Sequence, residues 1–331
     1  YPDVPIPEPV GLVFSFFGRR SKMHYVPDET AMEDIQMTTN SDPAEIPQEV
    51  YELYDAYCHG DMSRRAFFSG LSKYAVGGLT VSTLAACVMP DYAKQQTQPG
   101  DDGLYEEMLL YDSPNGAGKM EGYFVRPAGA EQALPGIVVI HENRGLNPHI
   151  KDVTRRAAQA GYVAFAPDAL YPLGGYPGND DDGRAMQAKR DRESMVQDFM
   201  AAAEFLRGHV AVNGKVGCVG FCFGGAVSNL MAVRQPWLSA AVPFYGGWPT
   251  VEEAADVKVP LQIHLAGLDE RVNSGWPVYK AALDENRAEY EAYIYPGVNH
   301  GFHNDTTSRY DEEAAQLAWA RTVEFFNLHL G

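Results

Sequence analysis

The amino-acid sequence predicts an α/β fold with a mostly parallel central sheet covered by helices on both faces, preceded by an N-terminal helical extension. Two observations indicate this. From about residue 104, short apolar runs alternate with longer helical stretches, the arrangement in which helices connect parallel strands. Four of these runs, over residues 136–140, 163–167, 216–220 and 240–244, contain no polar side chain, which is typical of strands buried on both faces. We therefore expect residues 101–331 to form one α/β domain.

The expected strands comprise one hairpin and six buried runs. The hairpin pairs residues 106–111 with residues 120–126 across the turn Ser113-Pro114-Asn115-Gly116. The buried strands are residues 136–140, 163–167, 216–220, 240–244, 261–266 and 290–295. The helices between and after them are expected near residues 150–160, 183–208, 224–234, 276–286 and 311–329.

The first hundred residues do not show this alternation of predicted strands and helices. Residues 1–45 are rich in Pro, Asp and Thr and show no sustained period, so we expect a poorly structured arm there. Residues 46–100 are expected to form a helical extension. Its first helix, residues 47–59, places Val50 and Tyr54 on one face, and Gly60 then favours a helix end.

The segment 63–87 has two readings that the sequence leaves open. Ser63-Arg64-Arg65-Ala66-Phe67-Phe68 precedes an apolar run and resembles a twin-arginine export signal, and Leu84-Ala85-Ala86-Cys87 resembles a lipoprotein cleavage box. The alternative is an amphipathic helix packed on the catalytic domain of a cytoplasmic protein. The apolar run is shorter than the ~20 residues that cross a bilayer.

Charge and cysteine content exclude several classes of function. The formal net charge of -18 disfavours nucleic acid and anionic membranes as partners, because both bind clustered Lys and Arg. Four cysteines without a C-x-x-C pair are too few for a disulfide framework, and free thiols fit a reducing compartment. No phosphate-binding or dinucleotide motif is present, and no H-E-x-x-H metal motif. We expect no metal, no cofactor and no stable protein partner.

The strongest chemical signal is a cysteine on a tight strand-to-helix turn. An apolar strand leads into Gly220-Phe221-Cys222-Phe223-Gly224-Gly225, and a helix follows. This is the nucleophile-elbow pattern with Cys in place of Ser. The glycines are needed because strand and helix crowd together at the turn. The start of the helix favours both a thiolate and a developing oxyanion.

Two further residues follow later strands in the order that a catalytic triad requires. Asp269 ends the run Leu265-Ala266-Gly267-Leu268-Asp269, and His300 lies in a glycine-bearing loop after residues 290–295. Nucleophile, acid and base in that order suit a sheet whose carboxyl ends form the site. Glu270 is an alternative acid, and His303 is an alternative base.

These motifs resemble the dienelactone hydrolase family, also called carboxymethylenebutenolidases, over roughly residues 104–331. The resemblance implies an α/β-hydrolase fold and a Cys222–His300–Asp269 triad. It adds the run His141-Glu142-Asn143-Arg144-Gly145, in which Glu142 would contact the resting thiol and help in its deprotonation. The backbone N–H groups of Asn143 and Phe223 would form the oxyanion hole. The alternative for Glu142 is an ion pair with Arg144.

The sequence departs from the family at one position that concerns substrate. Members acting on dienelactone carry an arginine shortly after the His-x-Phe segment, where this chain has Asn304. Arg184 or Arg190 could replace that cation. An uncharged ester or lactone is therefore an equally good candidate substrate. The aromatic residues expected near the pocket are Tyr171, Tyr245, Trp248 and Trp276, with Tyr245 the best placed because it follows a strand end.

The expected function is hydrolysis of a small ester or lactone through a thioester acyl-enzyme on Cys222. Two alternatives stay open. One is thioester hydrolysis or acyl transfer at the same cysteine. The other is a non-catalytic binding module on a hydrolase fold.

Overall fold

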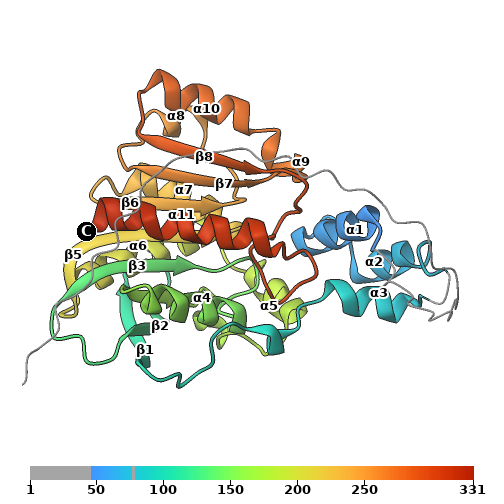
Figure 1. The fold of residues 1–331 in the computed structure, drawn as a ribbon, viewed down its shortest axis with the longest axis horizontal. Helices are drawn as coiled ribbons and strands as arrows, with labels where there is room; N and C mark the ends of the chain where they lie inside the picture. Colours follow the sequence, from blue (N-terminus) through green and yellow to red (C-terminus); the bar gives the residue numbers. More distant parts are fainter. Residues whose placement is uncertain (1–45, 77–78) are drawn as a thin grey trace, which may run out of the picture. The chain divides into compact units, whose positions relative to one another are not determined.

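The central element is an eight-stranded sheet in the order β1-β2-β4-β3-β5-β6-β7-β8 (Figure 1). The computed structural model describes residues 46–76 and 79–331. The strands are β1 Leu104–Ser113, β2 Gly118–Pro127, β3 Leu134–Ile140, β4 Val163–Pro167, β5 Val212–Phe221, β6 Ala240–Phe244, β7 Leu261–Ala266 and β8 Tyr290–Tyr295. β2 pairs antiparallel with β1 and with β4, and β4-β3-β5-β6-β7-β8 are parallel. The predicted α/β fold is confirmed.

Two helical layers cover the sheet, because the strands are apolar on both faces. α4 and α11 pack over one face, with Ile150, Val153 and Phe326 among the buried contacts. α6, α7 and α10 cover the other. The helices of this domain are α4 Pro148–Gln159, α5 Asp180–Gln187, α6 Arg192–Gly208, α7 Phe223–Arg234, α8 Val251–Ala254, α9 Glu270–Asn273, α10 Trp276–Glu285 and α11 Glu312–Leu330, with a 3-10 turn η2 Tyr171–Leu173.

The predicted single helix over residues 183–208 is wrong, because the structure divides it into α5 and α6. Each helix has its own N-cap. Asn179 accepts a hydrogen bond from the Asp182 N–H at 2.9 Å, and Asp191 accepts one from the Ser194 N–H at 2.8 Å. A capping Asp sets a new helix start even inside a helical pattern. The break lets α5 turn away from the sheet toward the N-terminal helices.

The N-terminal extension consists of α1 Gln48–His59, α2 Arg64–Leu71, α3 Val81–Val88 and the 3-10 turn η1 Tyr92–Lys94. Its helices share a small core that includes Val50, Tyr54, Phe67 and Leu84. Ser63 caps α2 by accepting from the Ala66 N–H at 3.2 Å. The helical character expected of residues 46–100 is present, whereas the expected arm over residues 1–45 lies outside the described residues.

The signal-like segment 63–87 forms α2 and most of α3, and the Cys87 side chain is exposed. None of the helices in the described part of the chain has the length and apolar character needed to cross a membrane. Export through the twin-arginine motif stays a prediction.

Candidate active site

The site forms at the carboxyl ends of β5, β7 and β8, and Cys222 lies at its centre. Cys222 follows β5 directly and has φ 55° and ψ −110°, a conformation that L-residues rarely adopt. Gly220 and Gly224 permit it, since a Cβ on Gly220 would overlap the Gly224 carbonyl and one on Gly224 would overlap the Ile140 carbonyl. The Cys222 N–H donates to the Phe244 carbonyl at 3.0 Å, which fixes the turn against β6. The strained turn presents the sulfur at the start of α7.

Asp269 and His300 form a buried ion pair beside this sulfur. His300 Nδ1 lies 2.5 Å from Asp269 Oδ2. The other Asp269 oxygen accepts from the Val272 N–H at 3.2 Å, so the carboxylate caps α9 and is held in place. A ring nitrogen of His300 and the sulfur of Cys222 lie within 4.8 Å of each other. The structure thus brings together the three residues expected to form a triad.

The alternative acid and base are placed differently. Glu270 is exposed on α9. His303 is fully buried and stacks on the Phe221 ring, with ring centroids 5.0 Å apart. Burial holds the pKa of His303 well below its usual value, so this ring is neutral and enclosed by aromatic side chains. The geometry favours Asp269 and His300.

Two backbone N–H groups are available for an oxyanion. Phe223 is the first residue of α7, so its N–H has no helical partner one turn earlier. Asn143 lies in the loop after β3. Neither N–H donates to a protein carbonyl among the residues that the structure describes. The oxyanion hole formed by these two N–H groups stays a prediction.

The side chains of Glu142 and Asn304 form a hydrogen bond with each other. The Asn304 side-chain amide donates to Glu142 Oε2 at 3.1 Å, and both side chains are buried. The Asn304 oxygen accepts from the Thr306 N–H and hydroxyl. Asn304 therefore orients Glu142, and its polar atoms are occupied by protein groups. Its predicted role in binding substrate stays a prediction, as does the contact of Glu142 with the resting thiol.

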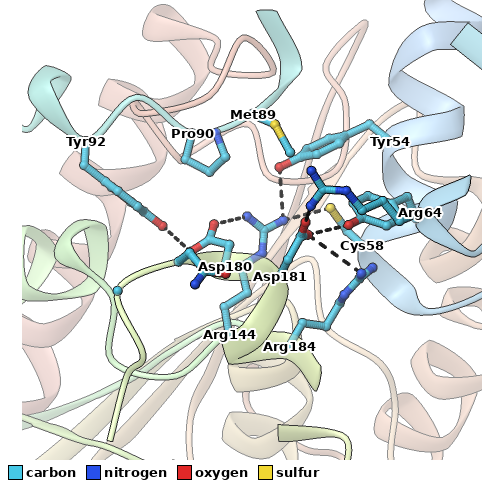
Figure 2. A pocket seen from close by; sticks show the side chains of 13 residues that line it. Tyr54, Cys58, Arg64, Met89, Pro90, Tyr92, Arg144, Asp180, Asp181 and Arg184 are labelled. Carbon is cyan, nitrogen blue, oxygen red and sulfur yellow. Dashed lines mark hydrogen bonds and ion pairs between the residues drawn. The ribbon is translucent and has the colours of Figure 1, made fainter. Parts of the chain in front are cut away.

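Arg144 does not form an ion pair with Glu142 within the described part of the chain but connects the oxyanion loop to the extension. Its guanidinium donates to Asp180 at 2.6 Å, to the Tyr54 hydroxyl at 3.3 Å and to the Cys58 sulfur at 2.8 Å. Figure 2 shows this guanidinium between Asp180 of α5 and the side chains of α1. Arg64 of α2 pairs with Asp181 at the same junction. The junction encloses a cavity of about 430 Å³.

A second imidazole contacts the sulfur, and no motif in the sequence predicts this contact. His59, the last residue of α1, places Nε2 3.3 Å from the Cys222 sulfur. Its ring lies edge-on to that of His300, with centroids 4.9 Å apart. In the sequence, His59 precedes a helix-ending glycine more than 160 residues before Cys222. Only the docking of the extension brings it to the site.

The chain is similar to proteins of one hydrolase family over its α/β domain. Residues 120–330 match the model of the dienelactone hydrolase family. The chain belongs to the dienelactone hydrolase family. Residues 37–77 match a second model, described as YqhI-like. The dienelactone hydrolase match therefore begins after the segment that carries His59.

Relatives and a solved structure agree with this assignment. A hydrolase fragment named YghX from Escherichia coli is 49% identical over 114 residues, which cover 34% of this chain and 97% of that protein. A protein from Saccharolobus solfataricus with the provisional name carboxymethylenebutenolidase is 29% identical over 258 residues, covering 66% of this chain and 97% of the relative. A Klebsiella pneumoniae structure described provisionally as a dienelactone hydrolase superposes with a TM-score of 0.60 at 26% identity, covering 67% of this chain and 99% of the other.

A cavity of about 420 Å³ adjoins the candidate oxyanion hole of this dienelactone hydrolase family member. Its lining includes Asn143, Phe223, His59, Met195 and Arg184. The Arg184 guanidinium lies 4.0 Å from the centroid of the Tyr57 ring and has one buried nitrogen, Nη1, without a hydrogen-bond partner in the described residues. Among the residues predicted to bind substrate, Arg184 and its alternative Arg190 both line this cavity.

The predicted aromatic residues pack against other parts of the protein. Tyr245 is buried, and its ring centroid lies 4.9 Å from that of His300, so it packs against the imidazole of the candidate base. Trp248 packs on Trp276 and donates its indole N–H to the Val272 carbonyl at 2.9 Å. Neither residue lines the cavity beside the oxyanion hole, and their roles in substrate binding stay predictions.

The sulfur and the two imidazoles also resemble a donor set for a soft dication, since ligand atoms of His59, Cys222 and His300 lie within 4.8 Å of one another. The neighbouring charge opposes a metal. Arg271 Nη2 lies 3.0 Å from His59 Nε2 and 3.3 Å from His300 Nδ1. A guanidinium is always protonated, so a dication here would face a permanent positive charge at short range. The arrangement suits an anion such as a thiolate.

Proposed function

We propose that this member of the dienelactone hydrolase family hydrolyses small carboxylic esters or lactones through a thioester on Cys222. The observation that supports it best is the strained cysteine beside the buried His300–Asp269 pair. Family membership supports hydrolysis of a small molecule, and the geometry supports the choice of residues. We also propose residues 101–331 as the catalytic domain and residues 46–100 as its helical extension.

The proposed reaction begins with Cys222 as a thiolate, whose S–H proton has passed to a neighbouring imidazole, and with His300 as an imidazolium. Burial opposes the charged form of His300, but the sulfur and Asp269 outweigh it and raise the pKa of this imidazole to about 9. Cys222 attacks the carbonyl carbon, forming a C–S bond, while the N–H groups of Asn143 and Phe223 stabilise the oxyanion. The C–O bond then breaks, and the leaving oxygen takes a proton from the His300 imidazolium. Water, deprotonated by His300, attacks the thioester, and the C–S bond breaks to release the acid. Asp269 holds His300 in one tautomer throughout.

The occupied side chain of Asn304 bears on the choice of substrate. The Asn304 amide is neutral and donates to Glu142, so it provides neither a positive charge nor that N–H to a substrate carboxylate. Three arginines of the described residues line the cavity, namely Arg184, Arg190 and Arg192. Arg184 Nη2 lies 3.8 Å from Asp181, and its Nη1 has no hydrogen-bond partner among those residues. Arg190 is engaged by Asp198 at 2.6 Å. We therefore propose uncharged esters and lactones as the primary substrates, with carboxylated ones accepted through Arg184.

A panel of small substrates tests this function. We expect hydrolysis of short aryl and alkyl esters and of simple lactones, because a cavity of about 420 Å³ holds a small molecule. Pairs that differ only by a carboxylate should differ by about tenfold or less in kcat/KM. In Arg184→Gln, the carboxylated member alone should lose activity. Hydrolysis of acyl thioesters at rates far above those of matched esters would favour the thioesterase alternative, and no turnover of any class would favour a binding module.

A further inference from the structure

The imidazole of His59 is held in a defined position at the nucleophile. Nδ1 lies 2.8 Å from the Asp55 carbonyl one turn earlier in α1, which leaves Nε2 directed at the Cys222 sulfur at 3.3 Å. Gly60, with φ 87°, ends the helix at this residue. The ring is therefore fixed by the helix that carries it and by the turn that follows.

The extension is also attached to the oxyanion loop next to this ring. The side-chain amide of Asn143 donates to the Cys58 carbonyl at 2.6 Å. Arg144 donates to the Cys58 sulfur, as seen at the centre of Figure 2. Both contacts are to the residue immediately before His59. Because Asn143 is also a proposed oxyanion donor, the same loop positions that N–H and the imidazole.

We propose that His59 is a second catalytic imidazole, which holds the sulfur of Cys222 as a thiolate and makes the helical extension part of the active site. This inference rests on the proposed role of Cys222 as nucleophile. In the resting state, the S–H bond breaks and its proton forms the Nε2–H bond of His59. The result is a thiolate beside an imidazolium, and no other bond changes. His300, which the sulfur and Asp269 also favour in its protonated form, then gives its own proton to the leaving group and takes one back from water.

The charges around His59 determine whether this ion pair forms. Asp55 lies 3.4 Å from His59 Nδ1 and favours the charged ring. Arg271 of α9 lies 3.0 Å from Nε2 and opposes it, since a guanidinium would donate to a neutral Nε2. The Asp55 carboxylate lies 3.5 Å from Arg271 Nε and partly offsets the positive charge of Arg271. It also forms an ion pair with Arg309 at 3.4 Å. His300 and the sulfur complete the groups that face the ring.

The balance favours the ion pair. Burial opposes ionisation of Cys222, but the charges of His300 and His59 outweigh it and lower the pKa of the thiol to about 6. Burial likewise opposes the charged form of His59, and the sulfur and Asp55 overcome it and raise the pKa of that imidazole. The thiolate is thus expected to be present above about pH 6 and lost as the pH falls through that value.

The test is the pH dependence of Cys222 alkylation by iodoacetamide, followed by mass analysis of the peptide that contains Cys222. The full chain is expected to titrate near pH 6, and His59→Gln should raise the midpoint by about one pH unit or more, because an opposite charge at this distance is lost. His59→Ala should behave similarly, and added imidazole should restore part of the rate at low pH. Asp55→Asn, which keeps the ring but weakens its charge, should raise the midpoint less.

Arg64→Gln is the matched control, since it also removes one positive charge from the extension but lies at the Asp181 contact. Its midpoint should stay that of the parent. An unchanged midpoint in both His59→Gln and Asp55→Asn, in protein that melts as the parent does, would overturn the inference. The titration reports sulfur ionisation whether or not an ester is cleaved. Full turnover by a Cys222 variant would instead overturn the proposed function and leave the titration result standing.

Discussion

Cys222→Ala is expected to lower kcat/KM for ester hydrolysis by roughly 10⁴-fold or more, with little change in stability. The substitution removes the atom that forms the acyl-enzyme, and losses of this order follow removal of a nucleophile in triad enzymes. Cys222 is largely buried at the start of α7, and alanine needs no more space than cysteine there. Steady-state kinetics and a thermal melt of the same preparation measure the two effects.

Two variants serve as comparisons for this result. Cys222→Ser should also be nearly inactive, because the hydroxyl does not ionise in a site arranged to hold a thiolate. Cys87→Ala removes an exposed thiol on α3 and should leave kcat/KM unchanged. Cys222→Ala with more than a few per cent of parent activity would exclude a covalent role for this sulfur.

His300→Gln is expected to lower kcat by roughly 10²- to 10⁴-fold, the range for a general acid–base group. Its imidazole is the one bonded to Asp269, at 2.5 Å, and its loss removes the base that activates water. With aryl esters, whose leaving group needs no proton, acylation should survive better than deacylation. We therefore expect a burst of about one phenol per active site followed by very slow turnover in stopped-flow assays.

Asp269→Asn should slow the same step, because the ring loses its orienting carboxylate. His329→Gln, on the last turn of α11, is the histidine control and should be neutral. The contradicting result would be equal losses in the rates of acylation and deacylation in His300→Gln, with no loss of either rate in His303→Gln. His300 would then orient the thiolate rather than act as a general acid and base.

Much of the fold follows from local patterns in the sequence. Continuous apolar runs mark β3, β4 and β6, because strands buried on both faces need no polar positions. Cys222, Asp269 and His300 each follow a predicted strand, and the carboxyl ends of parallel strands share one edge of a sheet. The sequence therefore predicts that these three residues lie at the same edge. The structure brings these side chains together, and the family comparison confirms the fold class and the resemblance to dienelactone hydrolases.

The parts that the sequence did not predict depend on contacts between distant segments. His59 reaches Cys222 only because α1 docks on the oxyanion loop through Asn143 and Arg144. No periodicity or motif in residues 46–100 encodes where that helix docks. The pairing of Asn304 with Glu142 is similar, since it joins residues 162 positions apart. The break between α5 and α6 does have a local signal, which is the N-cap residue Asp191. The helical pattern that continues on both sides of Asp191 makes this signal hard to recognise in the sequence.

During turnover, the sulfur of Cys222 is expected to carry the acyl group of the substrate. Acid-quenching the protein during turnover of a slow aryl ester, followed by mass analysis of the peptide containing Cys222, detects this acyl-enzyme. We expect one acyl group on that peptide, lost on treatment with hydroxylamine and more abundant in His300→Gln. Turnover with no acyl group on Cys222, or an acyl group on another residue, would show that Cys222 is not the nucleophile.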